Sequence, residues 1–213
     1  MPIAFHGLVG LFVALLINRA ADCWLNPAPL QCGLTRHPAR RTVILIAMPA
    51  LLMLMAQPQP DSPALWPMSL FAAVLVLLAV IDWEQRRIPN AVSLPVLALA
   101  WGYAWQGGFL LSAVAGTAVA FASFAAFYAL GRRMYGIGAL GAGDVKLAGL
   151  IGAIVGLAGA PYALALGVFM AGAAVGIGAL SGRIRRGDTM PYGTYLAVAA
   201  AIFVAAGFRL PVQ

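Results

Sequence analysis

The stretch from residue 71 to residue 87, "FAAVLVLLAVIDWEQRR", is an apolar run that ends in a carboxylate and a pair of arginines. Apolar runs recur along the whole chain, which has 213 residues, 63% of them hydrophobic and only 9% charged. A helix needs ~20 predominantly apolar residues to cross the hydrocarbon core of a bilayer. The sequence therefore predicts an all-α protein, a polytopic bundle of transmembrane helices.

Eight segments are predicted to span the membrane. The segment from 144 to 181 is divided at Gly159-Ala160-Pro161, because as one helix it would measure about 57 Å, against ~30 Å of hydrocarbon. The spans expected are 3–19, 42–56, 63–82, 89–106, 109–130, 144–159, 161–181 and 190–208.

Basic residues occupy alternate gaps between these spans. Cytoplasmic loops of bacterial membrane proteins are enriched in Lys and Arg. Here the basic residues follow spans one, three, five and seven, and of all 13 only Arg209 departs from this pattern. We therefore predict both termini on the non-cytoplasmic side. The formal charge of +7 then reflects orientation, and no nucleic acid is expected as a partner.

Two regions of the chain are distinguished by their loops. Residues 1–62 are expected to form two N-terminal spans joined by a short cytoplasmic loop, and residues 63–213 a six-span core. The loop, at about 20–41, contains prolines and lacks apolar periodicity, so we expect it to be compact and to lie against the membrane. It also holds Cys23 and Cys32, which cannot frame a disulfide-rich fold.

The chain has only six acidic residues, and an ionisable group at membrane depth costs at least ~2.5–3.5 kcal/mol. Four of them have ordinary explanations. Asp22 and Asp61 lie in polar gaps and are predicted to be solvated, while Glu84 and Asp188 are predicted to form surface ion pairs with neighbouring arginines.

Asp82 and Asp144 remain, and both are predicted to lie at the cytoplasmic boundary of the membrane. Asp144 could simply cap a helix, and arginines could simply neutralise Asp82. Two carboxylates within hydrogen-bonding reach, however, cannot both ionise easily. The charged one can then take a proton from water while the protonated one polarises a peptide carbonyl. Hydrolysis of this kind requires no metal and no cofactor.

Gly141 and Gly143 precede Asp144 in "GALGAGDVKL", residues 138–147. A peptide bond within a substrate helix must be drawn into an extended form before water reaches its carbonyl. Glycines beside the carboxylate would let that extended backbone approach closely. They could also serve close packing between membrane helices.

Three stretches together resemble the bacterial type IV prepilin peptidases, which are membrane aspartic proteases. They are "AVIDWEQRRIPNAVSLP" around Asp82, "GALGAGDVKLAGLIGA" around Asp144, and "MPYGTYLA" at 190–197. The resemblance implies that Asp82 and Asp144 are the catalytic pair, and that Pro191, Tyr192 and Gly193 form the element before the last helix. We assign these three, with Gly141, Gly143 and Lys146, to substrate binding; Lys146 could instead meet lipid phosphate.

The resemblance also implies a place and a partner. The expected localisation is the bacterial cytoplasmic (inner) membrane. The expected substrate is a prepilin or pseudopilin with a single apolar helix, cleaved at its leader peptide at the cytoplasmic membrane boundary. Neither the choice of pilin nor the oligomeric state follows from the sequence.

The chain departs from the longer, bifunctional members of that family, which carry paired CxxC motifs for zinc and also methylate the new pilin N-terminus. Here the loop has no CxxC. Cys23, Cys32 and His37 would make a poor tetrahedral zinc site. The resemblance therefore does not extend to methyltransferase activity.

Three other classes remain open on the residues alone. One is another intramembrane protease of the GxGD type. A second is a proton-coupled transporter, although transporters place their sites near the midplane of the membrane. The third is a non-catalytic scaffold whose carboxylates are helix caps.

Overall fold

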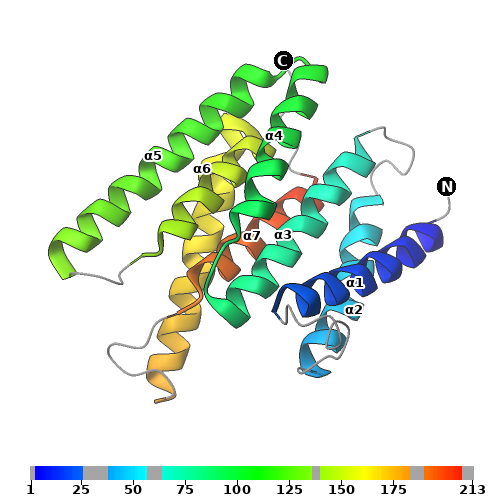
Figure 1. Ribbon diagram of the computed structural model, residues 1–213, viewed down its shortest axis with the longest axis horizontal. Helices are drawn as coiled ribbons and strands as arrows, with labels where there is room; N and C mark the ends of the chain where they lie inside the picture. The colour runs from blue at the N-terminus through cyan, green and yellow to red at the C-terminus, as the bar shows by residue number, and fades with distance from the viewer. Residues whose placement is uncertain (1–2, 26–37, 57–63, 136–139, 183–189, 208–213) are drawn as a thin grey trace.

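The computed structural model describes residues 3–25, 38–56, 64–135, 140–182 and 190–207. Within these ranges all regular elements are helices, which confirms the all-α prediction (Figure 1). They are α1 (Ile3–Leu25), α2 (Pro38–Ala56), α3 (Leu65–Gln85), α4 (Asn90–Gln106), α5 (Leu110–Tyr135), α6 (Ala142–Leu180) and α7 (Tyr192–Ala205).

Five of these helices, α1, α2, α3, α5 and α6, are long and apolar enough to cross a membrane. Large apolar side chains also cover their outer surfaces; Leu111 is 84% exposed and Leu180 is 91% exposed. Hydrocarbon, unlike water, suits such a surface. Because α4 has 17 residues and α7 has 14, the eight-span count stays a prediction.

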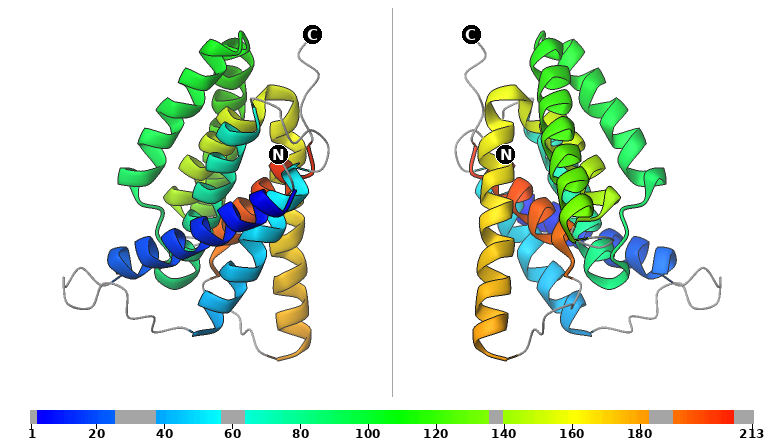
Figure 2. Two further views of the ribbon diagram at one scale, coloured as in Figure 1. Left: turned by 90° about the vertical axis from the view of Figure 1, so that its right-hand side faces the viewer. Right: turned by 90° about the vertical axis from the view of Figure 1, so that its left-hand side faces the viewer.

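The long helix α6 is sharply bent at Gly156, and Figure 2 shows its two halves running in different directions. Gly156 has φ 72° and ψ 178°, a conformation essentially restricted to glycine. The break was predicted at Gly159-Ala160-Pro161 and lies slightly earlier. At the break, the Leu157 amide donates a hydrogen bond to Ser112 Oγ of α5 at 3.1 Å, which supplies a partner for an amide that the bend frees.

Helices α5 and α6 pack backbone against backbone next to this bend. A Cβ atom added to Gly116 would lie 2.5 Å from the carbonyl oxygen of Gly152 and 2.7 Å from the carbonyl carbon of Gly156. Small residues permit this close approach between membrane helices. The packing holds the first half of α6, which carries Asp144.

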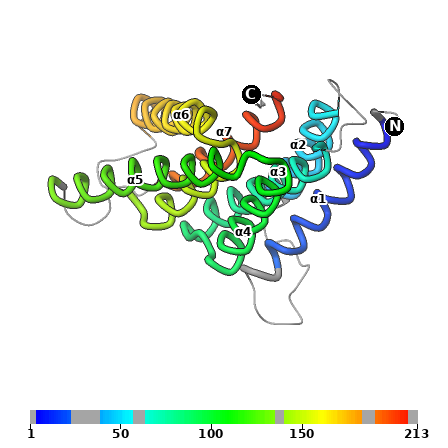
Figure 3. Tube along the Cα trace, turned by 90° about the horizontal axis from the view of Figure 1, so that it is seen from above, coloured from blue at the N-terminus to red at the C-terminus, as the bar shows by residue number. Residues whose placement is uncertain are grey.

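The apolar core consists of two clusters. The larger one contains residues of all five helices from α3 through α7. Its fully buried side chains include Leu75, Leu78, Leu147, Ile151 and Leu196. The smaller one joins α1 and α2 to α3 and to the end of α7. Seen from above in Figure 3, α3 lies between α1 at one end and α5 at the other. Since α3 and α7 contribute to both clusters, the division at residue 62 stays a prediction.

The segment predicted as a loop at about 20–41 is shorter than expected. Helix α1 continues to Leu25 and α2 begins at Pro38. Asp22, in the last turns of α1, has an ion-pair partner on α2. Cys32 and His37 lie outside the described residues.

Candidate active site

Three helix ends converge on one small volume at the ends of α3, α6 and α7. Asp82 lies in the last turn of α3, Asp144 in the first turn of α6, and Gly193 in the first turn of α7. Both carboxylates are buried, with Asp82 4% exposed and Asp144 7% exposed. They are close enough to interact electrostatically. The structure thus brings together the two aspartates that the sequence singled out.

Asp82 is held by the first turn of α7. Its Oδ2 accepts a hydrogen bond from the Thr194 amide at 2.7 Å and lies 3.1 Å from Thr194 Oγ1. That hydroxyl is also 3.1 Å from the Ala79 carbonyl oxygen, and having one proton it donates to one of the two at a time. The amide end of the α7 dipole favours a negative charge here.

Thr194 was not among the predicted site residues. The signal in the sequence was a hydroxyl residue directly after Pro191-Tyr192-Gly193, at the start of an otherwise apolar helix. Hydroxyl residues at such positions commonly bond nearby backbone groups, so this signal has an ordinary explanation too. In the structure, Thr194 instead contacts the side chain of Asp82.

Asp144 uses its two oxygens differently. Its Oδ2 accepts a hydrogen bond from the Gly141 amide at 3.1 Å, and its own amide donates to the Gly141 carbonyl at 3.1 Å. The sequence offered Asp144 as an ordinary N-cap residue, but the N-cap is Gly141, and Asp144 contributes to the cap from the third helical position. The other oxygen, Oδ1, faces Gly193.

Gly193 occupies the space between the two carboxylates. A Cβ atom added to it would lie 2.8 Å from Asp144 Oδ1 and 3.0 Å from Asp82 Oδ2. The same atom would lie 3.0 Å from Ile88 Cδ1, in the link between α3 and α4. A glycine at this position therefore lets the backbone of α7 approach both carboxylates closely, and a side chain would clash with them.

The two glycines of the GxGD motif have other neighbours. A Cβ atom on Gly143 would make ordinary contact with Ile88, at 3.4 Å from its Cβ. A Cβ atom on Gly141 would lie 3.1 Å from Asp144 Oδ2, the oxygen that the Gly141 amide binds. Access of a substrate backbone past Gly141 and Gly143 stays a prediction.

The other predicted binding residues surround the pair at different distances. Tyr192 is half-buried and close enough to Asp144 to interact with it electrostatically. Pro191 is buried and precedes the first residue of α7. Lys146 is exposed, and its Nζ donates to Asn90 Oδ1 at 3.0 Å. Lys146 therefore links the start of α6 to the start of α4.

The prediction that Asp22 is solvated is wrong. Asp22 is 3% exposed and forms an ion pair with Arg40 of α2. Glu84 is paired as expected, but its partner is also Arg40 rather than a neighbour in sequence. The reason is that α1 and α2 pack beside the end of α3, which a sequence gap does not reveal. Among the described residues, no group of three or more His, Cys, Asp or Glu side chains is placed to hold a metal ion.

Comparison with known proteins identifies a family that the chain matches. The type IV leader peptidase family matches residues 69–177, just over half of the chain, and this region contains both Asp82 and Asp144. No solved structure gives a significant match.

Several curated proteins named prepilin leader peptidase/N-methyltransferase are similar to the chain. The protein of Pseudomonas putida is 37% identical over 135 residues, covering 61% of this chain and 46% of the relative. That of Burkholderia pseudomallei (strain 1026b) is 32% identical over 156 residues, covering 71% of this chain and 50% of the relative. That of Neisseria gonorrhoeae is 27% identical over 139 residues, covering 64% and 47%.

The chain spans about half the length of the curated relatives it matches. Its apolar helices, together with these relatives, make it a multi-pass membrane protein. The match covers α3 to α5 and most of α6, the elements that carry the two buried aspartates and the core around them. The chain belongs to the type IV leader peptidase family.

Proposed function

We propose that the protein is a membrane aspartic endopeptidase that removes the leader peptide of prepilins or pseudopilins. One observation carries this proposal: two buried carboxylates from distant parts of the chain meet beside Gly193. Both carboxylates lie inside the region that the family matches. The relatives named prepilin leader peptidase support the choice of substrate. No comparison favours another GxGD protease or a transporter.

In the proposed reaction, Asp82 and Asp144 share one proton and act as a unit. The charged carboxylate takes a proton from water as the oxygen of that water attacks the carbonyl carbon of the peptide bond. The protonated carboxyl gives its proton to the carbonyl oxygen. The tetrahedral intermediate then collapses and the C–N bond breaks. The leaving nitrogen takes up the proton that the first carboxylate received from water, and the other carboxylate takes a hydroxyl proton from the intermediate, so that the pair again shares one proton.

The neighbouring residues have supporting roles in this proposal. Thr194 fixes Asp82, and the Gly141 amide fixes Asp144. Gly193 lets the first turn of α7 pack against both carboxylates without a clash. Gly141, Gly143, Lys146, Pro191 and Tyr192 are proposed to line the path of the substrate backbone.

The proposed location is the bacterial inner membrane, with eight spans, both termini on the non-cytoplasmic side and the aspartates at the cytoplasmic boundary. The alternating basic residues support this orientation. The bend at Gly156 supports counting α6 as two spans. We further propose that the chain does not methylate its product, because the gap between α1 and α2 contains no CxxC motif.

The test is cleavage of a purified prepilin by the purified protein in detergent or in membranes. The proposal expects a product shortened by its leader peptide, and expects a chelator to leave the rate unchanged. A wild-type protein that leaves prepilins and pseudopilins intact would refute it. A proton-coupled transport activity that depends on Asp82 and Asp144 would favour the transporter instead.

A further inference from the structure

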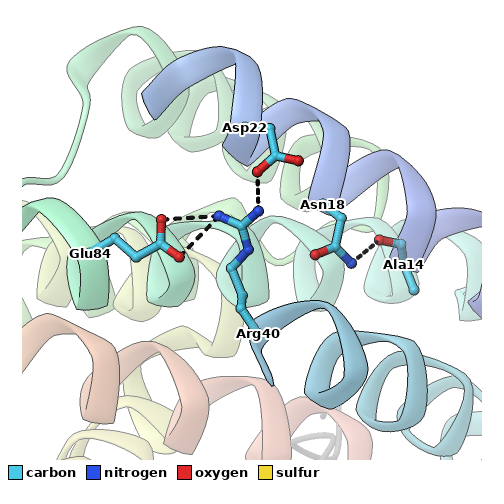
Figure 4. Close-up of polar contacts among 5 residues, drawn as sticks. All are labelled: Ala14, Asn18, Asp22, Arg40 and Glu84. Carbon is cyan, nitrogen blue, oxygen red and sulfur yellow. Dashed lines mark hydrogen bonds and ion pairs between the residues drawn. The ribbon is translucent and has the colours of Figure 1, made fainter. Parts of the chain in front are cut away.

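A largely buried ion-pair cluster joins the ends of α1, α2 and α3 (Figure 4). Arg40, in the first turn of α2, donates through Nη1 to both carboxylate oxygens of Glu84 at 3.0 Å. Its Nη2 donates to Asp22 of α1. The side chains of Arg40 and Asp22 are 9% and 4% exposed, and that of Glu84 is 12% exposed. One guanidinium thus bridges two carboxylates on two other helices.

Glu84 follows Asp82 by two residues on the same helical turn. Two residues along an α-helix correspond to a rotation of about 200° around its axis, so the two side chains point to nearly opposite sides. Accordingly, Asp82 contacts Thr194 of α7, while Glu84 contacts Arg40 of α2. The last turn of α3 is therefore held from opposite sides, by α7 through Asp82 and by α2 through Glu84.

This turn needs holding because it ends the helix. The last carbonyl groups of a helix lack partners within it, and helix ends fray. Here the chain leaves the helix at Arg86, a non-glycine residue with φ 53°, and the Arg86 amide donates to the Asp82 carbonyl at 2.7 Å. The backbone of Asp82 is thus part of the helix terminus itself.

The ion pairs fix how the ends of the three helices are placed relative to one another, rather than adding net folding stability. The desolvation of a buried pair can cancel its Coulombic gain, and apolar side chains could hold three helices together equally well. The guanidinium, however, binds Glu84 through Nη1 and Asp22 through Nη2, so its planar shape sets the direction of both carboxylates. Because Asp82 and Glu84 share the last turn of α3, a displacement of that turn would move both carboxylates.

We propose that Arg40 is a positioning residue for the carboxylate pair. Through Glu84 it fixes the last turn of α3, so that Asp82 lies at the separation from Asp144 that hydrolysis needs; Asp22 in turn holds Arg40 in place. This inference rests on the proposed peptidase function. It assigns a role in the catalytic step to α1 and the start of α2. Both precede the region that the family matches.

The test measures kcat and KM for prepilin cleavage by wild-type protein and by Arg40→Met. Displacing a reacting group by about 1 Å can cost ~100-fold in rate. We expect kcat to fall by about tenfold to a hundredfold and KM to stay within about twofold, because Arg40 does not touch the substrate. Arg40→Lys keeps the charge but cannot bind both carboxylates in the same fork geometry, so its kcat should be intermediate.

Met48→Ala is the matched control. Met48 lies in the same helix, is fully buried and belongs to the smaller apolar cluster, so its truncation loosens the same helix interface without touching Glu84. Equal losses of kcat for Arg40→Met and Met48→Ala at equal loss of Tm would overturn the inference. A rise in KM alone for Arg40→Met would overturn it too.

Arg40→Met leaves two buried carboxylates without their shared partner and can therefore fail to fold. The triple variant Asp22→Asn, Arg40→Met, Glu84→Gln removes all three charges together and keeps the side-chain sizes similar. The inference expects it to fold and to show the same loss of kcat. Wild-type kcat in the folded triple variant would overturn the positioning role while the peptidase function stands; a wild-type protein that cleaves no prepilin would overturn the function itself.

Discussion

Gly193→Ala is the substitution that the geometry of the site constrains most closely. The added methyl group would lie 2.8 Å from Asp144 Oδ1 and 3.0 Å from Asp82 Oδ2. The backbone itself accepts alanine, since Gly193 is not among the glycines with positive φ. The effect of the substitution therefore comes from the contacts that the methyl group makes with the two carboxylates.

The magnitude follows from these distances. Ordinary contacts begin near 3.4 Å, so each carboxylate would have to move by roughly half an ångström. Thr194 and the Gly141 amide oppose this movement. Overpacking of this kind costs about 1–3 kcal/mol of folding free energy. Displacement of the reacting groups should lower kcat by about 100-fold, or about 2.7 kcal/mol of transition-state stabilisation.

The assay is leader cleavage with kcat and KM measured separately, alongside thermal unfolding of the purified variant. Gly102→Ala is the control, because nothing lies within 4 Å of a Cβ atom at that position. Gly143→Ala places its methyl group in ordinary contact with Ile88, so a loss of turnover there would report on the predicted contact with substrate. If folded Gly193→Ala keeps kcat within about threefold of wild type, the reasoning that the added methyl group displaces the two carboxylates is refuted.

Three further predictions use other parts of the chain. Thr194→Val keeps the backbone amide on Asp82 but removes the hydroxyl, so kcat should fall about tenfold. Thr194→Ser keeps a hydroxyl and should have most of the wild-type kcat. Equal rates for the wild type and the two variants would exclude a role for the hydroxyl. Mass spectrometry should find an unmethylated N-terminus on pilin processed by this protein alone, and the pair Cys23→Ser with Cys32→Ser should still cleave; a methylated product would contradict this. Reporter fusions at four positions should all report cytoplasm, and a periplasmic signal at any one would refute the eight-span orientation; the positions are after Arg41, Arg87, Arg133 and Arg186.

The sequence predicted the helices well because an apolar run long enough to cross a membrane has few alternatives to a helix. It did not place the break within the block from 144 to 181. Such a block is apolar on all sides, so it contains no periodicity that a bend would interrupt. The break lies at Gly156, where the backbone of α5 approaches through Gly116, and that contact joins segments distant in the sequence.

The two aspartates could be predicted because a carboxylate next to the hydrocarbon is costly and needs a reason. The contacts of Thr194 and of Asp22 could not. Thr194 gains its meaning only when α7 meets the end of α3. Asp22 seemed solvated because its partner, Arg40, lies beyond a loop and on another helix. In both cases the decisive contact depends on how helices pack, and the uniform apolar surfaces of membrane helices encode that packing weakly.

The measurement that tests the central claim most directly is prepilin cleavage by Asp82→Asn, by Asp144→Asn and by the double variant, with Asp188→Asn as the control of equal charge. An amide can neither accept nor share the proton, so each single substitution should remove nearly all cleavage. Because the two carboxylates act as one unit, the double variant should be about as inactive as either single one. Cleavage near the wild-type rate by Asp82→Asn or Asp144→Asn would contradict the account, and so would an equal loss in Asp188→Asn.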